Sequence, residues 1–468
     1  MMNTEEKEKI FGDLYDLECI NFVKEYNEGR RALAYVRTFG CQQNEADSER
    51  IRGILSALGY EMADDYHGSD LIILNTCAVR ELAEEKVFSL LGNFRAEKRK
   101  NPELIVGVVG CMGAIKECVD RLKRSFHFLS FTLGAGVMHK LPAVIRGVIS
   151  EGGRIFVPSG ERECVVEGIP IIRSEGHRAF VSIMYGCNNF CSYCIVPYTR
   201  GRERSRAAHR IISECRELVS MGVKDITLLG QNVNSYRAEI DFPTLLDRVA
   251  SIEGDFTVNF MTSHPKDTTD ALIEVMARHG GKIAPHFHLP LQSGSDRILA
   301  DMNRKYTKDA FIDIAGRLKE RIPDINMTTD VIVGYPSETE EDFLETLEVL
   351  RQVKFDAVYA FLYSARTGTR AALSTDTVDE AVKHERIKRL LSMQDDISKE
   401  RSLSYVGTRQ RVLVDSYSAD RGVYNGRTVS GRLVHFSADF AKIGEFTNVL
   451  IDNANAFDLF GKKLDEVN

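Results

Sequence analysis

The sequence lacks a long hydrophobic run. Its first 31 residues mix acidic and basic side chains without a continuous apolar stretch, whereas a membrane span needs about 20 consecutive apolar residues. This pattern excludes a signal peptide or membrane anchor in that segment, and we expect no membrane partner. The ten cysteines suit a reducing compartment in which thiols bind metals rather than form disulfides, so we expect a cytoplasmic protein.

The sequence also lacks an excess of positive charge. A net charge of -7 argues against binding polyanions over the whole surface, although nucleic acid needs only a local basic surface. Two local basic runs are present, and the alternative interpretation of each is a solvated helix face. The runs contain Arg200, Arg202, Arg204, Arg206 and Arg210, and then Lys383, Arg386, Lys388 and Arg389.

The densest cysteine motif has no fourth cysteine. Cys187, Cys191 and Cys194 form a C-x3-C-x2-C pattern, and no Cys or His follows nearby. Thiolates hold iron–sulfur clusters, and a four-iron cluster held by only three of them leaves one iron open to another ligand. The alternative is zinc, but structural zinc prefers four ligands in paired C-x2-C knuckles. The pattern therefore favours a 4Fe-4S cluster with one open iron.

Three more cysteines each follow an apolar segment in the first third of the chain. We predict strands at residues 32–39, 71–75 and 104–109, and helices at 44–58 and from about 80 to 95. Alternating strands and helices predict a doubly wound parallel sheet. Because ligands bind at the carboxyl edge of such sheets, Cys41, Cys77 and Cys111 are expected to converge there.

Each of these three cysteines also precedes a predicted helix, where the helix dipole favours a thiolate. Three ligands would again leave one iron open, free to carry an extra sulfur atom. The alternative is that three buried cysteines merely end three strands.

The central part of the chain alternates strands with helices. We predict strands at 180–184, 225–229, 257–261, 286–289, 327–333 and 357–362. We predict helices at 205–219, 242–252, 269–278, 308–321 and 339–353. Six strand–helix units predict an open (β/α)6 barrel, a partial TIM barrel, with its site at the carboxyl ends of the strands.

The last part of the chain turns to short alternating strands after a charged helix at 377–405. Strands at 410–414, 431–436 and 447–452, punctuated by glycines, predict a small β-barrel of the oligonucleotide-binding style. The alternative is a β-rich domain that only packs on the central barrel. The arginines that could meet phosphates are Arg409, Arg411, Arg427 and Arg432.

A chain of 468 residues is too long for one core, so we expect several domains. We place an N-terminal extension at 1–31, a cluster-binding domain at 32–150, a linker at 151–178, the partial barrel at 179–400 and the small β-barrel at 403–468.

Several motifs together resemble the methylthiotransferases, a radical S-adenosylmethionine (SAM) family. They are Phe-Gly-Cys-Gln-Gln-Asn at 39–44, Asn-Thr-Cys-Ala-Val-Arg-Glu at 75–81 and Val-Pro-Tyr-Thr-Arg-Gly at 196–201, together with the Cys187 motif. The resemblance covers nearly the whole chain from about residue 32. It implies a radical SAM barrel in the centre and a terminal barrel of the TRAM type.

The resemblance also implies cofactors and a reaction. One SAM would methylate a sulfur carried at the Cys41, Cys77 and Cys111 cluster. A second SAM would be cleaved by one electron at the other 4Fe-4S cluster. The resulting radical would remove hydrogen from carbon 2 of a purine, a bond that acid–base catalysis cannot reach, so no catalytic side chain is expected beyond the cluster ligands.

The motifs are most similar to the branch that modifies isopentenyl-adenosine at position 37 of tRNA, beside the anticodon, and Val79-Arg80-Glu81 favours that branch. Alternatives are the same chemistry on threonylcarbamoyl-adenosine in tRNA or on a ribosomal-protein aspartate, and a non-catalytic iron–sulfur protein that binds RNA or carries electrons. We expect tRNA, a flavodoxin- or ferredoxin-like electron donor and a sulfur source as partners of a monomer.

Seven residues near strand ends are candidate SAM contacts, and six arginines are candidate RNA contacts. The SAM candidates are Tyr193, Gly230, Gln231, Asn232, Ser263, Gln292 and Asp330. The RNA candidates are Arg200, Arg202, Arg204, Arg206, Arg427 and Arg432. We interpret His264, His286 and His288 as hydrogen-bonded structure rather than a metal site.

Overall fold

A computed structural model of the protein describes residues 16–77, 81–159, 165–174 and 176–464. Its internal contacts divide the chain into two compact units. The first comprises the chain up to Ser174 with two later segments, Met184–Asn188 and Cys194–Ser205, and the second comprises the rest. The predicted helix start at residue 80 and the residues Val79 and Arg80 lie outside the described residues.

The first unit contains a sheet of six parallel strands in the order β2-β1-β3-β4-β5-β6. The strands are β1 (Leu33–Phe39), β2 (Glu61–Met62), β3 (Leu71–Thr76), β4 (Ile105–Gly110), β5 (Phe131–Gly134) and β6 (Ile155–Val157). The strand order reverses direction between β1 and β3, which confirms the doubly wound sheet.

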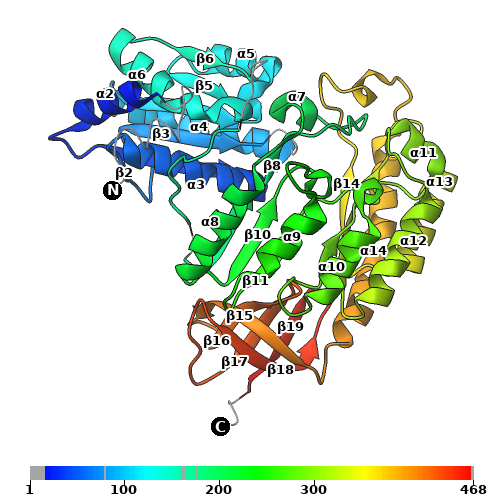
Figure 1. Cartoon of the computed structure of the whole chain (residues 1–468). Helices are drawn as coiled ribbons and strands as arrows, with labels where there is room; N and C mark the ends of the chain where they lie inside the picture. Colours follow the sequence, from blue (N-terminus) through cyan, green and yellow to red (C-terminus); the bar gives the residue numbers. More distant parts are fainter. Residues whose placement is uncertain (1–15, 78–80, 160–164, 175, 465–468) are drawn as a thin grey trace. The chain divides into compact units, whose positions relative to one another are not determined.

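Helices cover both faces of this sheet (Figure 1). They are α2 (Leu17–Asn27), α3 (Gln42–Ala57), α4 (Glu81–Lys100), α5 (Lys116–Ser125) and α6 (Leu141–Glu151). Every residue of β3 and of β4 is buried, as expected for central parallel strands that pack on both faces. The core therefore lies on either side of the strands that lead to Cys77 and Cys111.

Two expectations for this region need correction. The short strand Ile155–Val157, which we assigned to the linker, pairs with β5 as the edge strand of the sheet. Cys111 does not precede a long helix but a three-residue 3-10 turn, Met112–Ala114, so the helix-dipole argument does not hold there. It holds for Cys41, which is the N-cap of α3.

The second unit contains six parallel strands in two sheets, in the orders β11-β10-β7 and β12-β13-β14. The strands are β7 (Arg178–Ser182), β10 (Asp225–Leu229), β11 (Thr257–Phe260), β12 (His286–His288), β13 (Asn326–Val333) and β14 (Ala357–Leu362). A parallel bridge between Val258 and Ile283 links β11 to the residues before β12. The open six-stranded barrel is thus confirmed.

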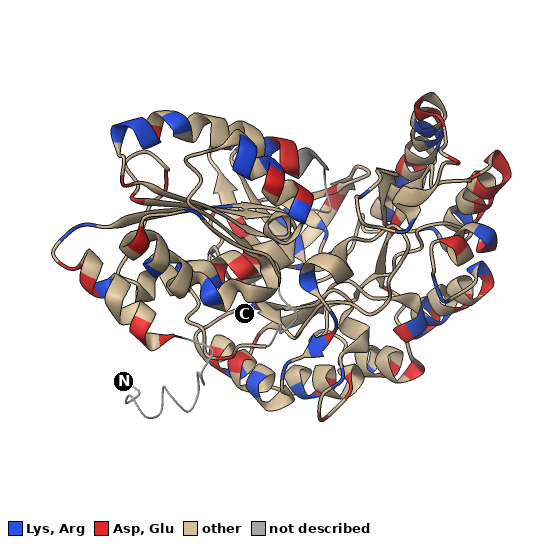
Figure 2. Cartoon of the chain, turned by 90° about the horizontal axis from the view of Figure 1, so that it is seen from above, with Lys and Arg blue, Asp and Glu red and all other residues tan. Residues whose placement is uncertain are grey.

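Helices form the outer layer of this barrel, with basic and acidic residues interspersed along them (Figure 2). They are α8 (Ala208–Ser220), α9 (Phe242–Ala250), α10 (Asp270–Arg278), α11 (Asp296–Asp301), α12 (Lys308–Arg321), α13 (Glu340–Val353) and α14 (Glu380–Leu403). The predicted helix at 205–219 begins later, at Ala208, because Arg204–Ser205 forms a short strand, β9, that pairs with β8 (Met184–Tyr185).

The C-terminal strands close into a five-stranded barrel in the order β15-β16-β17-β19-β18 (Figure 1). They are β15 (Arg409–Ser418), β16 (Val423–Thr428), β17 (Leu433–Ser437), β18 (Phe446–Ala454) and β19 (Asp458–Lys463). Asn326, which starts β13, donates a hydrogen bond to Ser430 O at 2.9 Å. This small barrel therefore packs at the amino ends of the β13 and β14 strands. Within the described residues, no helix is long and apolar enough to cross a membrane.

Candidate metal centres

The three N-terminal cysteines follow three neighbouring strands of one sheet. Phe39, Thr76 and Gly110, the last residues of β1, β3 and β4, lie in register. Adjacent parallel strands lie about 4.8 Å apart. The structure therefore brings Cys41, Cys77 and Cys111 to one sheet edge, next to the β1/β3 reversal where doubly wound sheets bind ligands.

A buried asparagine, Asn44, connects the ends of these strands through hydrogen bonds. Asn44 Oδ1 accepts hydrogen bonds from the Cys41 backbone N–H and from Cys41 Sγ, both at 3.3 Å. Its Nδ2 donates to Thr76 O at 3.1 Å, and Cys111 N donates to the same oxygen at 2.9 Å. One side chain and one carbonyl thus connect the surroundings of all three cysteines.

The glycine before Cys111 makes this network possible. Gly110 has φ +93°, and a Cβ placed on it would lie 2.5 Å from Thr76 O and 2.6 Å from Asn75 Oδ1. Any side chain at this position would collide with the acceptors that hold the strand ends. Glycine at position 110 is therefore a steric requirement of the edge.

The N-terminal trio has one open side and one buried cation. Cys77 and Cys111 are buried, whereas Cys41 is exposed. Arg200, at the end of α7 (Val196–Arg200), donates to Asp47 Oδ2 at 2.9 Å, and both side chains are buried. Burial alone lowers the pKa of Arg200, but Asp47, Cys111 and Cys41 together raise it above its ordinary value. This positive charge favours the thiolate forms of the cysteines.

The second cysteine trio lies on a loop whose segments are assigned to different units. Cys187 and Cys194 belong to segments that pack with the first unit, and Cys191 belongs to one that packs with the second. Within the first unit, Ile195 is buried against Cys111. The residue after Cys194 therefore contacts a member of the N-terminal trio.

Within the second unit, Cys191 contacts a buried arginine. Arg304 Nη1 donates to Cys191 Sγ at 3.4 Å. Burial alone lowers the pKa of Arg304, but Tyr306, Tyr193 and Cys191 raise it well above its ordinary value, so the guanidinium stays charged. Sequence reasoning missed this residue, because it lies 113 positions from Cys191 and no local signal connects the two.

Most of the predicted SAM contacts follow the carboxyl ends of barrel strands, whereas Asp330 lies within β13 and Tyr193 lies on the cysteine loop. Asn232 Oδ1 accepts from His264 N at 3.1 Å, which joins the segments that follow β10 and β11. Gln292 N donates to Asp330 O at 2.8 Å, and Tyr193 packs on a small apolar cluster that includes Met302. Gly230 and Gln231 directly follow β10.

Several buried polar atoms near this end have no hydrogen-bond partner among the described residues, and two of them belong to adjacent residues after β11. These two are Ser263 Oγ and His264 Nε2, on side chains only 3% and 4% exposed. Burial, reinforced by the charges of Arg304 and Lys266, lowers the pKa of His264 to about 2. Since buried polar atoms normally have partners, this end of the barrel has the character expected of a site that receives a polar ligand.

The other histidines serve structure, as predicted. His286 Nε2 and His288 Nδ1 both hydrogen-bond to Thr328 Oγ1, at 3.1 and 3.0 Å. His288 Nε2 also lies 3.3 Å from Asp330 Oδ2. Asp330 is therefore already engaged by the barrel.

The structure corrects three of the six predicted RNA contacts. Arg200, Arg206 and Arg432 are buried, and their guanidinium groups bond to protein acceptors. Arg206 donates to Ser182 O and Glu214, and Arg432 donates to Ser402 and Asp356. A consecutive run of arginines does not reveal such partners, because they lie far away in the sequence.

The remaining basic candidates differ in exposure. Arg202 and Arg427 are exposed, and Arg204 is half-buried, with Nη2 donating to Arg200 O at 3.1 Å. In the second basic run, Lys383 and Arg386 are buried, and Arg386 pairs with Glu338 at 2.9 Å. Of the six predicted RNA contacts, only Arg202 and Arg427 are therefore exposed.

The donor set suits iron–sulfur clusters better than single metal ions. In the part of the chain that is described, no three His, Cys, Asp or Glu side chains converge as the ligands of one ion do. In a four-iron cluster each thiolate binds a different iron, so its ligands surround an inorganic core instead of meeting at a point. Three thiols at one edge with an adjacent cation fit such a group.

Comparison with known families and proteins defines the class of protein. The Radical SAM superfamily model matches residues 181–350, a model described as uncharacterized protein family UPF0004 matches 33–134, and the TRAM domain model matches 403–464. A radical SAM methyltransferase, TsrM from Kitasatospora setae, superposes with a TM-score of 0.54 at 14% identity, covering 73% of this chain and 75% of its own. That likeness concerns the fold alone.

Full-length relatives define the family. The tRNA-2-methylthio-N(6)-dimethylallyladenosine synthase of Caldicellulosiruptor saccharolyticus is 45% identical over 451 residues, 96% of each chain. The enzyme of the same name from a Thermoanaerobacter species is 43% identical over 450 residues, 95% of each chain. The chain belongs to this family of radical SAM methylthiotransferases.

Proposed function

We propose that the protein replaces the hydrogen on carbon 2 of N6-isopentenyladenosine, at position 37 of tRNA, with a methylthio group. The observation that carries the proposal is the pair of cysteine trios in a chain of this family. When bound, two 4Fe-4S clusters and SAM supply the chemistry: a radical made from one SAM removes the hydrogen, and another SAM methylates sulfur carried at the N-terminal cluster.

We assign Cys41, Cys77 and Cys111 as ligands of the N-terminal cluster. Asn44 and the Thr76 carbonyl hold the strand ends that carry them, and Arg200 favours their thiolate forms. The exposure of Cys41 leaves a side on which sulfur can enter. We propose a separate sulfur source and a flavodoxin- or ferredoxin-like electron donor as partners.

We assign Cys187, Cys191 and Cys194 as ligands of the cluster that binds SAM. Ser263, Asn232 and Gln292 are proposed to contact SAM, because they follow the barrel strands at the end where the orphaned Ser263 and His264 atoms lie. Within the first unit, Ile195 keeps the backbone beside Cys194 against Cys111.

We propose that the exposed arginines Arg202 and Arg427 contribute to tRNA binding through phosphate contacts. Arg427 lies on β16 of the TRAM barrel, and its side chain reaches solvent. The buried Arg432 serves instead to fix that barrel to the partial barrel through Asp356.

The test is nucleoside analysis of tRNA from a strain that lacks the gene, with and without the restored protein. We expect 2-methylthio-N6-isopentenyladenosine to disappear and N6-isopentenyladenosine to accumulate in the deletion strain. Unchanged tRNA, together with a loss of methylthio product from threonylcarbamoyl-adenosine or a ribosomal protein, would assign the same chemistry to another substrate.

A further inference from the structure

The segment after helix α11 forms hydrogen bonds with the loop that carries Cys191. Asn303 has φ 58° and ends the helical stretch, and its Nδ2 donates to Asn189 O at 3.2 Å and to Phe190 O at 3.0 Å. A side chain of the barrel therefore holds the backbone just before Cys191.

The backbone just after Cys191 is held by the same segment. Ser192 N donates to Met302 O at 2.9 Å, and Ser192 Oγ donates to Asp301 O at 2.6 Å. Hydrogen bonds on both sides of Cys191 thus fix where its sulfur lies relative to residues 301–304.

Arg304 completes this arrangement with a contact to the sulfur itself. It is 8% exposed, and its three guanidinium nitrogens donate to Cys191 Sγ at 3.4 Å, Pro290 O at 3.2 Å and Tyr306 Oη at 3.0 Å. Among the described residues, no carboxylate accepts a hydrogen bond from Arg304. The positive charge therefore acts on the sulfur without a neutralising partner beside it.

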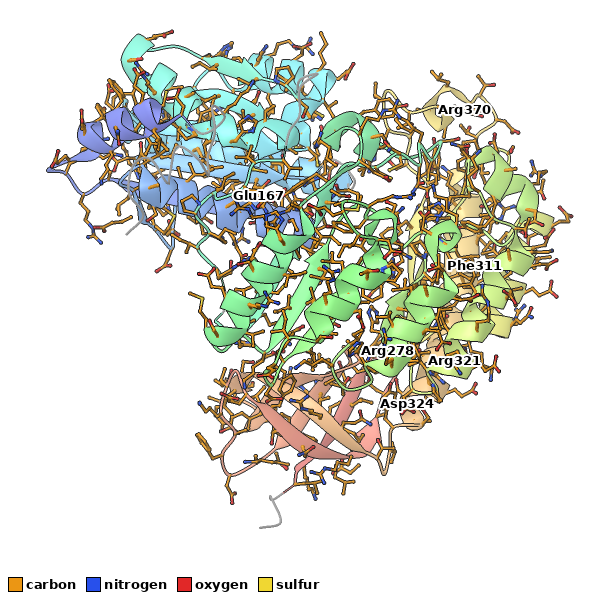
Figure 3. The ribbon with its side chains drawn as sticks, viewed as in Figure 1. Glu167, Arg278, Phe311, Arg321, Asp324 and Arg370 are labelled. Atoms are coloured by element: carbon orange, nitrogen blue, oxygen red, sulfur yellow. The ribbon has the colours of Figure 1, made fainter. Side chains whose placement is uncertain are left out.

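The surroundings keep Arg304 in one orientation. Tyr306 donates to Leu291 O at 2.7 Å, and its ring lies 6.0 Å from that of the fully buried Phe311. Figure 3 labels Phe311, which belongs to α12. Tyr306 also reaches Pro290 O at 3.0 Å, so that carbonyl keeps a donor if Arg304 is replaced.

We propose that Arg304 is a positioning residue for the SAM-binding cluster, and that its N–H···S hydrogen bond to Cys191 raises the reduction potential of that cluster. The proposal rests on the proposed function, which makes Cys191 a ligand. Hydrogen bonds to ligand sulfurs and nearby charge set cluster potentials, and a buried cation stabilises the more negative reduced state. Arg304 thus eases the entry of the electron that cleaves SAM.

The test compares Arg304→Met with Lys305→Met in the full-length protein with both clusters loaded. Lys305 is the exposed neighbour, so its variant removes the same charge from the surface. Iron is counted, and the midpoint potential of the SAM-responsive signal is measured by redox titration with electron paramagnetic resonance. We expect a more negative potential for Arg304→Met and a wild-type value for Lys305→Met.

A second readout separates this role from simple structural support. SAM cleavage by Arg304→Met is expected to be slow with a flavodoxin-type donor and to recover with a stronger chemical reductant. A wild-type potential at full iron content overturns the proposal. Iron loss in Arg304→Met but not in Lys305→Met supports the positioning role. Arg304→Gln, which removes the charge but keeps a polar side chain, then tests the midpoint potential at full iron content: a more negative value supports the proposal, and an unchanged one overturns it.

Failure of the proposed function gives a different result. If SAM does not alter the signal of the wild-type protein, or if Cys191→Ala leaves that signal intact, Cys191 is not a ligand of a SAM-binding cluster. A shift confined to the Arg304 variants leaves the proposed function in place.

Discussion

The two cysteine trios reach their positions in opposite ways. The N-terminal trio is spread over 71 positions from Cys41 to Cys111, and a parallel sheet gathers it at one edge. The second trio is local in sequence, and its loop is held in place by hydrogen bonds from a distant segment. The first trio therefore needs the whole domain to fold, whereas the second needs one loop to be fixed.

A buried arginine accompanies each trio, but the two differ in what balances their charge. Arg200 pairs with the carboxylate of Asp47 at 2.9 Å. Arg304 donates to a thiol, a carbonyl and a phenol. We infer that Arg200 mainly joins α7 to α3, and that Arg304 acts mainly on its cysteine.

The largest expected effect separates the two trios by activity. Cys191→Ala is expected to abolish SAM cleavage, because the cluster that binds SAM loses a ligand. Cys77→Ala is expected to keep SAM cleavage and lose methylthio transfer, because only the sulfur-carrying site is damaged. The measurement is deoxyadenosine and modified nucleoside formed by the same anaerobic samples. Equal loss of both products in both variants would contradict the division of labour.

The next effect tests whether Arg200 is a structural ion pair. Asp47→Asn leaves a buried guanidinium without its counter-charge, which costs about 3–5 kcal/mol when a buried pair is broken. Hydrogen exchange of the β3 and β4 amides is expected to accelerate accordingly. Glu61→Gln is the matched control, because its pair with Arg31 is exposed on both sides and surface pairs contribute about 0–1 kcal/mol. Equal acceleration of hydrogen exchange in the two variants would show that the buried pair contributes no more to stability than the exposed one.

A pH effect is expected in the second unit. The pKa of His264 is about 2 in the folded chain against about 6.5 unfolded, so the unfolded state binds the extra proton between these values. The contribution of neutral His264 to the free energy of unfolding is therefore fully present above about pH 6.5. It falls by about 1.4 kcal/mol for each pH unit below that value. Denaturation of cluster-free protein between pH 4 and 7 measures this slope, and His264→Gln is expected to reduce it. The same slope in both proteins would show that His264 does not stay neutral.

The smallest effect concerns the exposed arginines, one proposed to contact RNA and one paired with a carboxylate. Arg427→Gln is expected to weaken tRNA binding modestly and to reduce the slope of log affinity against log salt by about 1, the signature of one lost phosphate contact. Arg278→Gln is the control, because Arg278 is an exposed arginine paired with Asp247 on α9. An unchanged salt slope for Arg427→Gln would remove Arg427 from the RNA contacts.

The long buried elements could be predicted because their patterns are strong. β3 and β4 are continuous apolar runs that end just before Cys77 and Cys111, and such runs with following helices specify a parallel sheet. The convergence of the three cysteines then follows from topology alone. Short edge strands gave no such signal: β2 has two residues and β6 has three.

The strands missed in the small barrel contain polar residues and glycine. β16 reads Val-Tyr-Asn-Gly-Arg-Thr, and glycine weakens the strand pattern. The structure shows why it is there: a Cβ on Gly426 would lie 2.4 Å from Leu413 O of the paired strand. Gly426 is required because the paired strand approaches closely, but in the sequence alone a glycine indicates the end of a strand.

The site residues that sequence reasoning missed are defined by distant partners. Asp47 lies 153 positions from Arg200, and no residue type or spacing connects them. Arg200, Arg206 and Arg432 were predicted at the RNA surface because arginine is common there, but burial and ion pairing depend on the fold. Cysteines were easier because few roles require three of them in fixed places.

The contact between Ile195 and Cys111 has a consequence for how the enzyme can evolve. Ile195 is joined by a peptide bond to Cys194, one proposed iron ligand. It is also in contact with Cys111, another proposed ligand. Insertions between residues 194 and 200 would move Ile195 away from Cys111, even though they would alter none of the six proposed cluster ligands. The segment 194–200 is therefore expected to tolerate few insertions or deletions, although most of its residues are not proposed ligands.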